Sequence, residues 1–310
     1  MGLLTNTTVG LISALPKGLV RRLASRYIAG EELPEAITRL QKLNADDFTA
    51  ILDILGEDDG SGDEAAAIAR ARSAQGQYIR AATELAGAGV DAYVSAKPTH
   101  FGLRQSEDLC FELYDELADH CAQHDQFLRV EMEDHPTVEG TLSVFERLLR
   151  KHANVGIVLQ SRLFRTGDDI QRLIGAVPTG HRLQVRMVKG IYLEPASIAH
   201  TDYQPIADAY VEHTRTLWAA GARVSLATHD DLMQPRLEAL RAELDVGTDA
   251  FEYQVLMGVR PPLWRAWQAA GLPVRVYVPY GPDWHAYSMR RLKKNPKLLQ
   301  QMALGIFAKS

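Results

Sequence analysis

Cysteine is scarce in this sequence, and the two that occur are badly placed for cross-linking. Only Cys110 and Cys121 are present among 310 residues. If both lie on one helix, they are separated by about 11 × 1.5 Å, roughly 16 Å, which is beyond disulfide reach. No C-x-x-C pair occurs either. We therefore expect no disulfide framework, no iron–sulfur centre and no metal site.

Long apolar runs and an excess of one charge are also missing. No stretch of 18 apolar residues occurs, and no basic region precedes the mildly apolar start of the sequence. We expect a cytoplasmic chain without a signal peptide or a membrane-spanning helix. The 39 acidic and 34 basic residues give a formal charge of -5, which provides no general attraction to nucleic acid. We predict no nucleic-acid partner.

Linkers rich in proline, glycine and serine are absent as well. The sequence instead contains eight short apolar runs, separated by longer stretches with helical spacing such as 63–88, 106–124, 138–151 and 205–220. Short strands that alternate with helices indicate right-handed βαβ units, and eight units favour a (β/α)8 barrel over a doubly wound sheet. The runs are FTAILDI (48–54), VDAYVSA (90–96), FLRVEM (127–132), VGIVLQ (155–160), LQVRMV (183–188), RVSLAT (223–228), AFEYQV (250–255) and VRVYVP (274–279).

Two amphipathic helical patterns, over 15–27 and 33–43, precede the first run. We interpret residues 1–46 as an amino-terminal helical cap that plugs the bottom of the barrel, and residues 47–310 as the catalytic (β/α)8 barrel itself. Catalytic groups of such barrels lie at the carboxyl ends of the strands. Polar and ionisable groups gathered there would be costly in a purely structural barrel, so they favour a catalytic rim. Those found at the ends of the runs are Asp53, Glu57, Lys97, His100, Glu131, Glu133, Asp134, Gln160, Arg186, Lys189, Thr228, His229, Gln254 and Tyr277.

Several segments resemble proline dehydrogenase, a family of flavin-dependent enzymes. They follow the family's order, as YIAGE (27–31), LDILGE (52–57), KPTHFGL (97–103), VRMVKGIYLE (185–194), SLATHD (225–230), FEYQVLMG (251–258) and VYVPYGPDWHAYSMRRLKKNP (276–296). The resemblance implies an α/β fold, a distorted (β/α)8 TIM barrel with amino-terminal helices and a final helix over the active site.

The activity that the resemblance implies is oxidation of L-proline to Δ1-pyrroline-5-carboxylate, with hydride transfer from C5 to N5 of a noncovalently bound FAD. Electrons would pass to a membrane quinone, and the reaction is the first step of proline catabolism to glutamate. The length of 310 residues does not accommodate the aldehyde dehydrogenase domain of bifunctional relatives. The resemblance is therefore to the monofunctional form, which depends on a separate pyrroline-5-carboxylate dehydrogenase.

Paired arginines suit a carboxylate ligand, because two guanidinium groups fix both its position and its direction. Taken alone, Arg290 and Arg291 are more typical of a solvated basic helix end. The resemblance implies that they clamp the proline carboxylate with support from Lys97, and that Glu57 pairs with Arg290 and closes the site. It implies that the catalytic residues are Lys97, Arg186, Tyr277, Arg290 and Arg291, and that the walls of the proline-ring pocket are Tyr192, Leu256, Tyr277 and Tyr287.

A cation near the N1–N5 edge of a flavin stabilises the negative charge of the reduced ring. Arg186 and Lys189 suit this role, and an ordinary ion pair at the barrel rim is the alternative. Two departures from the family concern the cofactor. Glu131 occupies a position where the family usually has an aspartate, and Lys294 occupies a position where the family commonly has a glutamate that bonds the cofactor, so we do not expect that contact here. Ile191 and Asp230 replace an alanine and an asparagine. The resemblance implies that FAD is bound by Glu131, Gln160, Arg186, Val188, Lys189, Gly190, Ala227, Thr228 and His229.

Four other interpretations stay open. Residues 60–65 match the dinucleotide fingerprint G-x-G-x-x-A, but the surrounding acidic residues oppose a pyrophosphate and a flexible loop is the alternative. His120 and His124 have the spacing of a metal pair on a helix, although no third ligand is evident. Three carboxylates at the end of the third run, Glu131, Glu133 and Asp134, could serve a barrel hydrolase with paired carboxylates or a divalent metal, or the barrel could be a binding module without catalysis. Only the flavin enzyme predicts a yellow protein.

The carboxyl-terminal segment combines basic residues with an apolar run. Arg290, Arg291, Lys293, Lys294 and Lys297 have no acidic residue between them, and MALGIF (302–307) follows. This pattern suits weak peripheral contact with the inner face of the cell membrane, and a tail packed on the barrel is the alternative. Because no credible nicotinamide site is present, we expect a diffusible acceptor, for which the resemblance implies a quinone.

Overall fold

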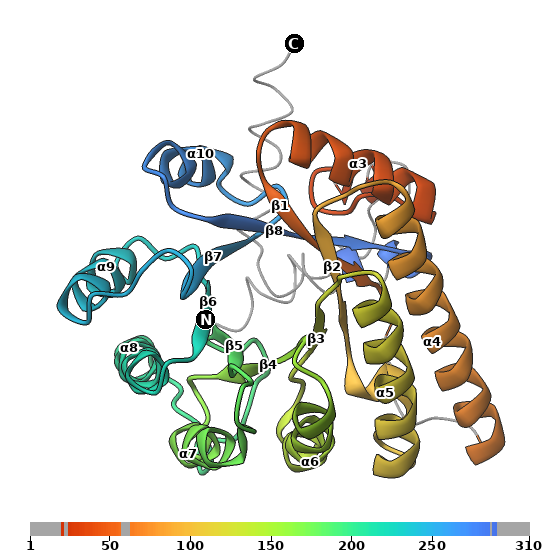
Figure 1. Cartoon of the computed structure of the whole chain (residues 1–310), viewed down its shortest axis with the longest axis horizontal. Helices are drawn as coiled ribbons and strands as arrows, with labels where there is room; N and C mark the ends of the chain where they lie inside the picture. Colours follow the sequence, from red (N-terminus) through yellow and green to blue (C-terminus); the bar gives the residue numbers. More distant parts are fainter. Residues whose placement is uncertain (1–19, 22–23, 57–62, 286, 290–310) are drawn as a thin grey trace, which may run out of the picture.

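The computed structural model describes residues 20–21, 24–56, 63–285 and 287–289. Its strands are β1 (Thr49–Ile54), β2 (Ala92–Ala96), β3 (Leu128–Val130), β4 (Val155–Gln160), β5 (Gln184–Val188), β6 (Arg223–Ala227), β7 (Phe251–Leu256) and β8 (Val274–Tyr280). All pairings are parallel and follow the sequence order, and β1 pairs with β8 to close the barrel. Figure 1 shows the helices arranged around these strands. The predicted (β/α)8 barrel is confirmed.

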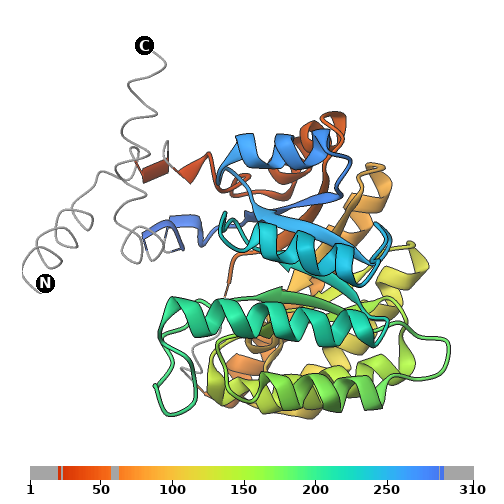
Figure 2. The same ribbon diagram turned by 90° about the vertical axis from the view of Figure 1, so that its left-hand side faces the viewer.

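Helices cover the outside of the barrel, and Figure 2 shows those of the second half of the chain, from green to blue, side by side along one flank. Two begin earlier than predicted, at His135 and Tyr203, because Pro136 and Pro205 lie in the first helical turn, where the missing N–H group is not needed. None of the described helices is long and apolar enough to cross a membrane. The helices are α3 (Leu33–Ala45), α4 (Glu64–Gly87), the 3-10 helix η1 (Pro98–Phe101), α5 (Glu107–Gln123), α6 (His135–Lys151), α7 (Thr166–Ala176), α8 (Tyr203–Ala219), α9 (Gln234–Glu243) and α10 (Pro261–Ala269).

The amino-terminal helix α3 lies on the wall of the barrel, where it packs against β1 and β8. The segment before it lies at the carboxyl end of the strands. There the N–H of Ala29 donates to the carbonyl of Pro279 at 2.9 Å, and the N–H of Gly281 donates to the carbonyl of Gly30 at 3.1 Å. Helix α3 therefore does not plug the bottom of the barrel as predicted, because amphipathic spacing identifies an apolar face but not the surface that covers it. Most of the other predicted helix, over 15–27, lies outside the described residues. The division into a cap and a barrel stays a prediction.

The interior of the barrel contains charged side chains. Arg129 and Glu252 are only 2% and 4% exposed. Glu252 Oε2 accepts hydrogen bonds from Arg275 Nε at 3.0 Å and from Arg223 Nη2 at 3.1 Å. Burial raises the pKa of Glu252, but the two arginines outweigh burial and hold the pKa at about 2. Because buried charges need such partners, this network belongs to the stable core.

Glu252→Gln is expected to lower the free energy of unfolding by about 3 kcal/mol at pH 7, since one pKa unit corresponds to about 1.36 kcal/mol. The folded-state pKa of Glu252 lies below the ordinary value of 4.5, so its stabilisation is complete above that pH and is lost as the pH falls toward 2. Urea unfolding should therefore show a smaller difference between variant and wild type at pH 3 than at pH 7. Equal differences at both pH values would contradict this. Glu243→Gln, which removes an exposed partner of Arg215, is the control and should change little.

Candidate active site

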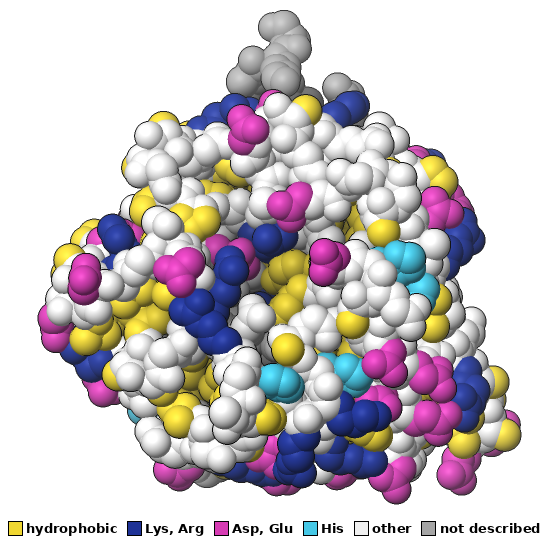
Figure 3. Space-filling model, in the orientation of Figure 1, with side chains coloured by type: hydrophobic (Ala, Val, Ile, Leu, Met, Phe, Trp, Pro, Cys, Tyr) yellow, Lys and Arg dark blue, Asp and Glu magenta, His cyan; other side chains and the backbone are white. Residues whose placement is uncertain are grey.

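A cavity of about 580 Å³ lies at the carboxyl ends of the strands, a size typical of small-molecule sites. In Figure 3, apolar side chains and Lys or Arg side chains lie beside one another around a central depression of this face. Every described residue to which the family resemblance gives a role lines the cavity: Lys97, Glu131, Gln160, Arg186, Val188, Lys189, Gly190, Tyr192, Ala227, Thr228, His229, Leu256, Tyr277 and Tyr287. His100 and Asp134, which the sequence also placed at the rim, are not among the lining residues. Glu57, Arg290 and Arg291 lie outside the described residues. The individual roles stay predictions.

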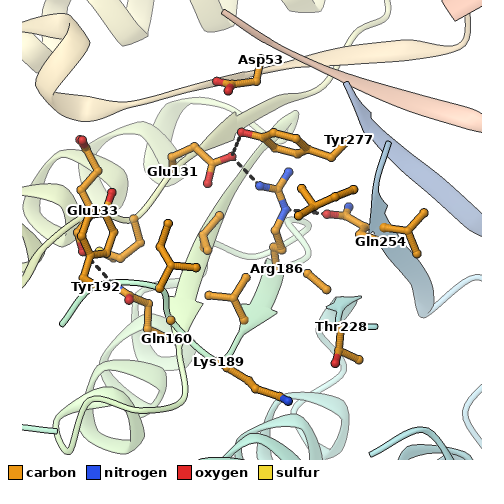
Figure 4. A pocket seen from close by; sticks show the side chains of 18 of the residues that line it. Asp53, Glu131, Glu133, Gln160, Arg186, Lys189, Tyr192, Thr228, Gln254 and Tyr277 are labelled. Atoms are coloured by element: carbon orange, nitrogen blue, oxygen red, sulfur yellow. Dashed lines mark hydrogen bonds and ion pairs between the residues drawn. The ribbon is translucent and has the colours of Figure 1, made fainter. Parts of the chain in front are cut away.

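Arg186 and Glu131 form a buried ion pair in the wall of the cavity, with Nη1 and Oε1 2.5 Å apart (Figure 4). The same carboxylate oxygen accepts hydrogen bonds from Ser95 Oγ at 2.5 Å and from the Tyr277 hydroxyl at 3.2 Å. Burial raises the pKa of Glu131, but Arg186, Ser95 and Lys97 outweigh burial, and the pKa lies below its usual value. Glu131 is thus an ionised acceptor that holds donors from three different strands together.

Asp53 and Lys97 form a second ion pair, at the end of β1 and just after β2. Asp53 is 1% exposed, and its Oδ1 lies 3.2 Å from Lys97 Nζ. Burial raises the pKa of Asp53; Lys97 pulls the pKa down, while the like charge of Glu131 raises it further, and the net shift is upward. The sequence placed Asp53 at a strand end without a role. The structure shows that it neutralises Lys97.

Lys189 and Asp230 form a third ion pair, in the loops after β5 and β6. Burial raises the pKa of Asp230, but Lys189 and Tyr203 outweigh burial and lower the pKa. Asp230, which replaces the asparagine usual in the family, therefore supplies a counter-charge for Lys189. The neighbouring Gly190 has a φ of 100°, and a Cβ there would lie 2.7 Å from Gln160 Oε1. Only glycine tolerates both this conformation and this close approach.

Two buried polar atoms of the cavity wall have no hydrogen-bond partner among the described residues. They are Oε1 of Gln160 and Nη2 of Arg186. The other end of the Gln160 amide is fixed, because Nε2 donates to the carbonyl of Glu133 at 2.7 Å. Buried polar groups in native proteins are almost always satisfied. The two atoms therefore fit a ligand that presents both a hydrogen-bond donor and an acceptor.

The carboxylates that suggested a hydrolase are engaged in structural contacts. Glu133 accepts hydrogen bonds from the N–H and the hydroxyl of Thr99 at 2.9 and 2.8 Å, and Asp134 accepts from Arg104 at 3.0 Å. His120 Nε2 lies 2.9 Å from a threonine hydroxyl. Within the described ranges, no three His, Cys, Asp or Glu side chains gather in a way that could hold a metal ion. These contacts weaken the hydrolase interpretation.

Sequence reasoning missed the residues that support the cavity from inside the barrel. Gln254 Oε1 accepts from Arg186 Nε at 2.5 Å, and Gln254 Nε2 donates to Glu252 Oε1 at 2.5 Å and to the Tyr93 hydroxyl at 2.9 Å. The sequence marked Gln254 only as a polar strand end. The available signal was the spacing of Glu252 and Gln254, which places two polar side chains on one face of a buried strand.

Comparison with known proteins identifies relatives over nearly the whole chain. The family model described as Proline dehydrogenase matches residues 36–303. Proline dehydrogenase of Deinococcus radiodurans is 33% identical over 291 residues, which cover 92% of this chain and 90% of the relative. Proline dehydrogenase 2 of Bacillus subtilis (strain 168) is 31% identical over 273 residues, which cover 88% of this chain and 86% of the relative.

A solved structure agrees with the fold. Proline utilization A (PutA) from Bdellovibrio bacteriovorus, inactivated by N-propargylglycine, superposes with a TM-score of 0.79 at 21% identity. The match covers 91% of this chain but only 33% of that protein, so it shows the barrel fold alone. The family model and the two sequence relatives carry the assignment further: the chain belongs to the proline dehydrogenase family.

Proposed function

We propose that this chain is an FAD-dependent proline dehydrogenase that oxidises L-proline to Δ1-pyrroline-5-carboxylate, the first step of proline catabolism to glutamate, and passes the electrons to a quinone. Family membership establishes the coarser statement, an oxidoreductase that acts on proline. The finer proposal is carried by the two unsatisfied atoms in the cavity wall, Gln160 Oε1 and Arg186 Nη2. The polar edge of a flavin ring offers the donor and the acceptor that these atoms lack.

The cofactor is proposed to bind noncovalently along β4, β5 and β6. When bound, FAD accepts the hydride that leaves C5 of proline. Arg186 supplies a fixed positive charge to the site, and Lys189 supplies a second that Asp230 moderates. His229 is oriented because its Nε2 accepts from the N–H of Leu256 at 3.0 Å. The proposed cofactor-binding residues are Glu131, Gln160, Arg186, Val188, Lys189, Gly190, Ala227, Thr228 and His229.

The substrate is proposed to bind against β7 and β8. An apolar wall orients the proline ring and excludes water, so the site contributes positioning rather than acid or base chemistry. Lys97 supports the carboxylate, together with Arg290 and Arg291 from outside the described residues, and Glu57 pairs with Arg290 to close the site. The proposed wall residues are Tyr192, Leu256, Tyr277 and Tyr287.

Tyr277→Ser is expected to narrow the preference for proline over 4-hydroxyproline, because an added hydroxyl must clash with the tyrosine ring or displace it. Two contacts hold the ring: its centroid lies 5.2 Å from the guanidinium carbon of Arg186, and its hydroxyl donates a hydrogen bond to Glu131. The ratio of kcat/KM for the two substrates measures the preference. Tyr277→Phe keeps the ring and should keep the preference of the wild type. A wild type that turned over both substrates equally would refute this assignment of Tyr277.

The electron acceptor is proposed to be a membrane quinone. The basic carboxyl-terminal segment lies outside the described residues, and on its sequence we propose weak peripheral contact with the inner face of the membrane by an otherwise cytoplasmic protein. A separate pyrroline-5-carboxylate dehydrogenase is proposed to take the product onward. The division into a helical cap (1–46) and a catalytic barrel (47–310) belongs to the same proposal.

The visible spectrum of the purified protein tests the cofactor and the acceptor together. We expect a yellow protein whose flavin is released on denaturation and is bleached by anaerobic L-proline. A soluble quinone analogue should restore the colour, and NAD should not. A folded preparation that stayed colourless after incubation with FAD would refute the flavin. Proline-driven NAD reduction as fast as quinone reduction would refute the acceptor.

A further inference from the structure

We propose that Gln254 is a positioning residue that sets the orientation of the Arg186 guanidinium, and that Glu252 and Tyr93 fix Gln254 in turn. The inference rests on the proposed function, because the orientation of Arg186 matters to the reaction only if this side chain faces the cofactor. None of the three supporting residues was given a role by the sequence, which marked Gln254 only as a polar strand end and did not single out Glu252 or Tyr93. All four side chains are buried, with 3% to 6% of their surface exposed.

The guanidinium of Arg186 is held by two contacts from opposite sides of the barrel. Nη1 donates to Glu131 Oε1 at 2.5 Å, and Nε donates to Gln254 Oε1 at 2.5 Å. Figure 4 shows Arg186 between these two side chains. A guanidinium is planar and rigid, so contacts at Nε and Nη1 determine where its third nitrogen points. That nitrogen, Nη2, is the buried donor without a partner among the described residues.

Gln254 must present its oxygen to Arg186, because a flipped amide would place its NH2 group opposite the Nε–H group of Arg186, and two hydrogen-bond donors would then face each other. An amide alone has no such preference, since its oxygen and nitrogen are similar in size and shape. The preference comes from the other end of the side chain, where Nε2 donates to Glu252 Oε1 at 2.5 Å and to the Tyr93 hydroxyl at 2.9 Å. An ionised carboxylate can only accept hydrogen bonds, so Glu252 determines which end of the amide faces it.

Glu252 is in turn immobile within the barrel. It lies two positions before Gln254 on β7, so both side chains point to the same face of the strand. Arg275 Nε and Arg223 Nη2 hold its second oxygen at 3.0 and 3.1 Å. A continuous chain of charge-assisted hydrogen bonds therefore runs from the middle of the barrel through Gln254 to Arg186.

This series of hydrogen bonds gives Gln254 an influence on the reduction of the cofactor that is distinct from its contribution to packing. If Arg186 Nη2 faces the cofactor, its position decides how strongly the site favours the negatively charged reduced ring. Loss of Gln254 would leave Glu131 as the hydrogen-bond partner of Arg186 among the described residues, with the Tyr277 ring beside it, and the guanidinium would be freer to turn. The expected result is a weaker preference for the reduced cofactor with little change in substrate affinity, because the hydrogen bonds of Gln254 go to Arg186, Glu252 and Tyr93 and not to Lys97 or the described wall residues.

The test compares wild type with Gln254→Leu and Tyr93→Phe as flavin-loaded proteins. Gln254→Leu should lower the midpoint potential by about 30 mV, which for a two-electron couple corresponds to an about tenfold loss of preference for the reduced form. Its kcat should fall about tenfold while KM for proline stays within about twofold. Tyr93→Phe, which removes one of the two acceptors of Gln254 Nε2, should shift the potential in the same direction by less.

Two controls remove comparable buried hydrogen bonds elsewhere. Gln126→Leu removes an amide that donates to the carbonyl of Ala82 at 3.0 Å, and Tyr253→Phe removes a hydroxyl that donates to Glu238 at 2.5 Å. Both variants should keep the midpoint potential of the wild type, because both groups contact the outer helices of the barrel and not the hydrogen bonds that lead to Arg186.

A yellow Gln254→Leu protein with the potential and kcat of the wild type would overturn the inference and leave the proposed function intact. If Gln254→Leu does not fold, Tyr93→Phe becomes the test, and a wild-type midpoint potential in that variant would also overturn the inference. A shift of equal size in the controls would also overturn the inference, because it would show a general response to lost buried hydrogen bonds. A wild type without flavin would refute the proposed function, and this inference with it.

Discussion

Arg186→Met is expected to lower kcat/KM for proline by about 100- to 1000-fold, the range found when one charge-stabilising donor is removed from an active site. The same variant should lose about 3 to 5 kcal/mol of unfolding free energy, because it leaves Glu131 as a buried carboxylate without its cation. With Arg186 gone, burial would raise the pKa of Glu131. The stability deficit should therefore shrink as the pH falls and Glu131 becomes protonated. Steady-state kinetics and urea unfolding at pH 7 and pH 4 measure both effects.

Two further variants separate charge from geometry in this prediction. Arg186→Lys keeps the charge without the planar fork, so it should retain more stability than activity. Arg172→Met removes an arginine that is paired with Glu146 and Glu139 but is 36% exposed, and it should cost less than about 1 kcal/mol. Full activity in Arg186→Met would contradict the role of this residue. A stability loss as large in Arg172→Met would contradict the explanation by burial.

Arg291→Ala is expected to lower kcat/KM for proline by about 30-fold to nearly 1000-fold, equivalent to about 2 to 4 kcal/mol for a charge-assisted bidentate contact. The described part of the cavity supports this expectation. Each of its Lys and Arg side chains already has a carboxylate partner: Lys97 has Asp53, Arg186 has Glu131 and Lys189 has Asp230. An amino-acid carboxylate therefore needs further cations, and Arg290 and Arg291 are the predicted source.

Prolinamide distinguishes this role from a general loss of structure. The amide lacks the carboxylate charge, so it should be a poor substrate for the wild type, and Arg291→Ala should affect its turnover much less than that of proline. A five-membered cyclic ether carboxylate should inhibit the wild type competitively and the variant weakly. Lys297→Ala changes a basic residue of the same segment and should leave both substrates unaffected. Unchanged kcat/KM for proline in Arg291→Ala would refute the clamp.

The fold was largely predictable because its signal is local. A parallel strand buried on both faces reads as a short apolar run, and all eight runs became strands. The rim residues were predictable for the same reason, since the end of a run marks the end of a strand. The position of α3 was not, because its amphipathic pattern fits many apolar surfaces equally well.

The pairing of the site residues could not be predicted, because it depends on which side chains meet across the barrel. Arg186 contacts Glu131, just after β3, and Gln254 on β7, and neither strand is a neighbour of β5 in the barrel. Asp230 looked like a neutral departure from the family until its contact with Lys189 showed a counter-charge. Such contacts follow from strand register and side-chain length, for which a single sequence has no periodic signal.

The pairing of β1 with β8 has a consequence for the time at which the protein acquires its site. Ile51 pairs with Tyr277, and Asp53 pairs with Pro279, although these strands are more than 200 positions apart in the sequence. Contacts between such distant segments form late in folding, because the entropy of closing a long loop must be overcome first. During synthesis, a ribosome must release the chain beyond β8 before the cavity has its last wall. A chain that ends before β8 would therefore lack the enclosed site, so ligand binding would report that the barrel has closed.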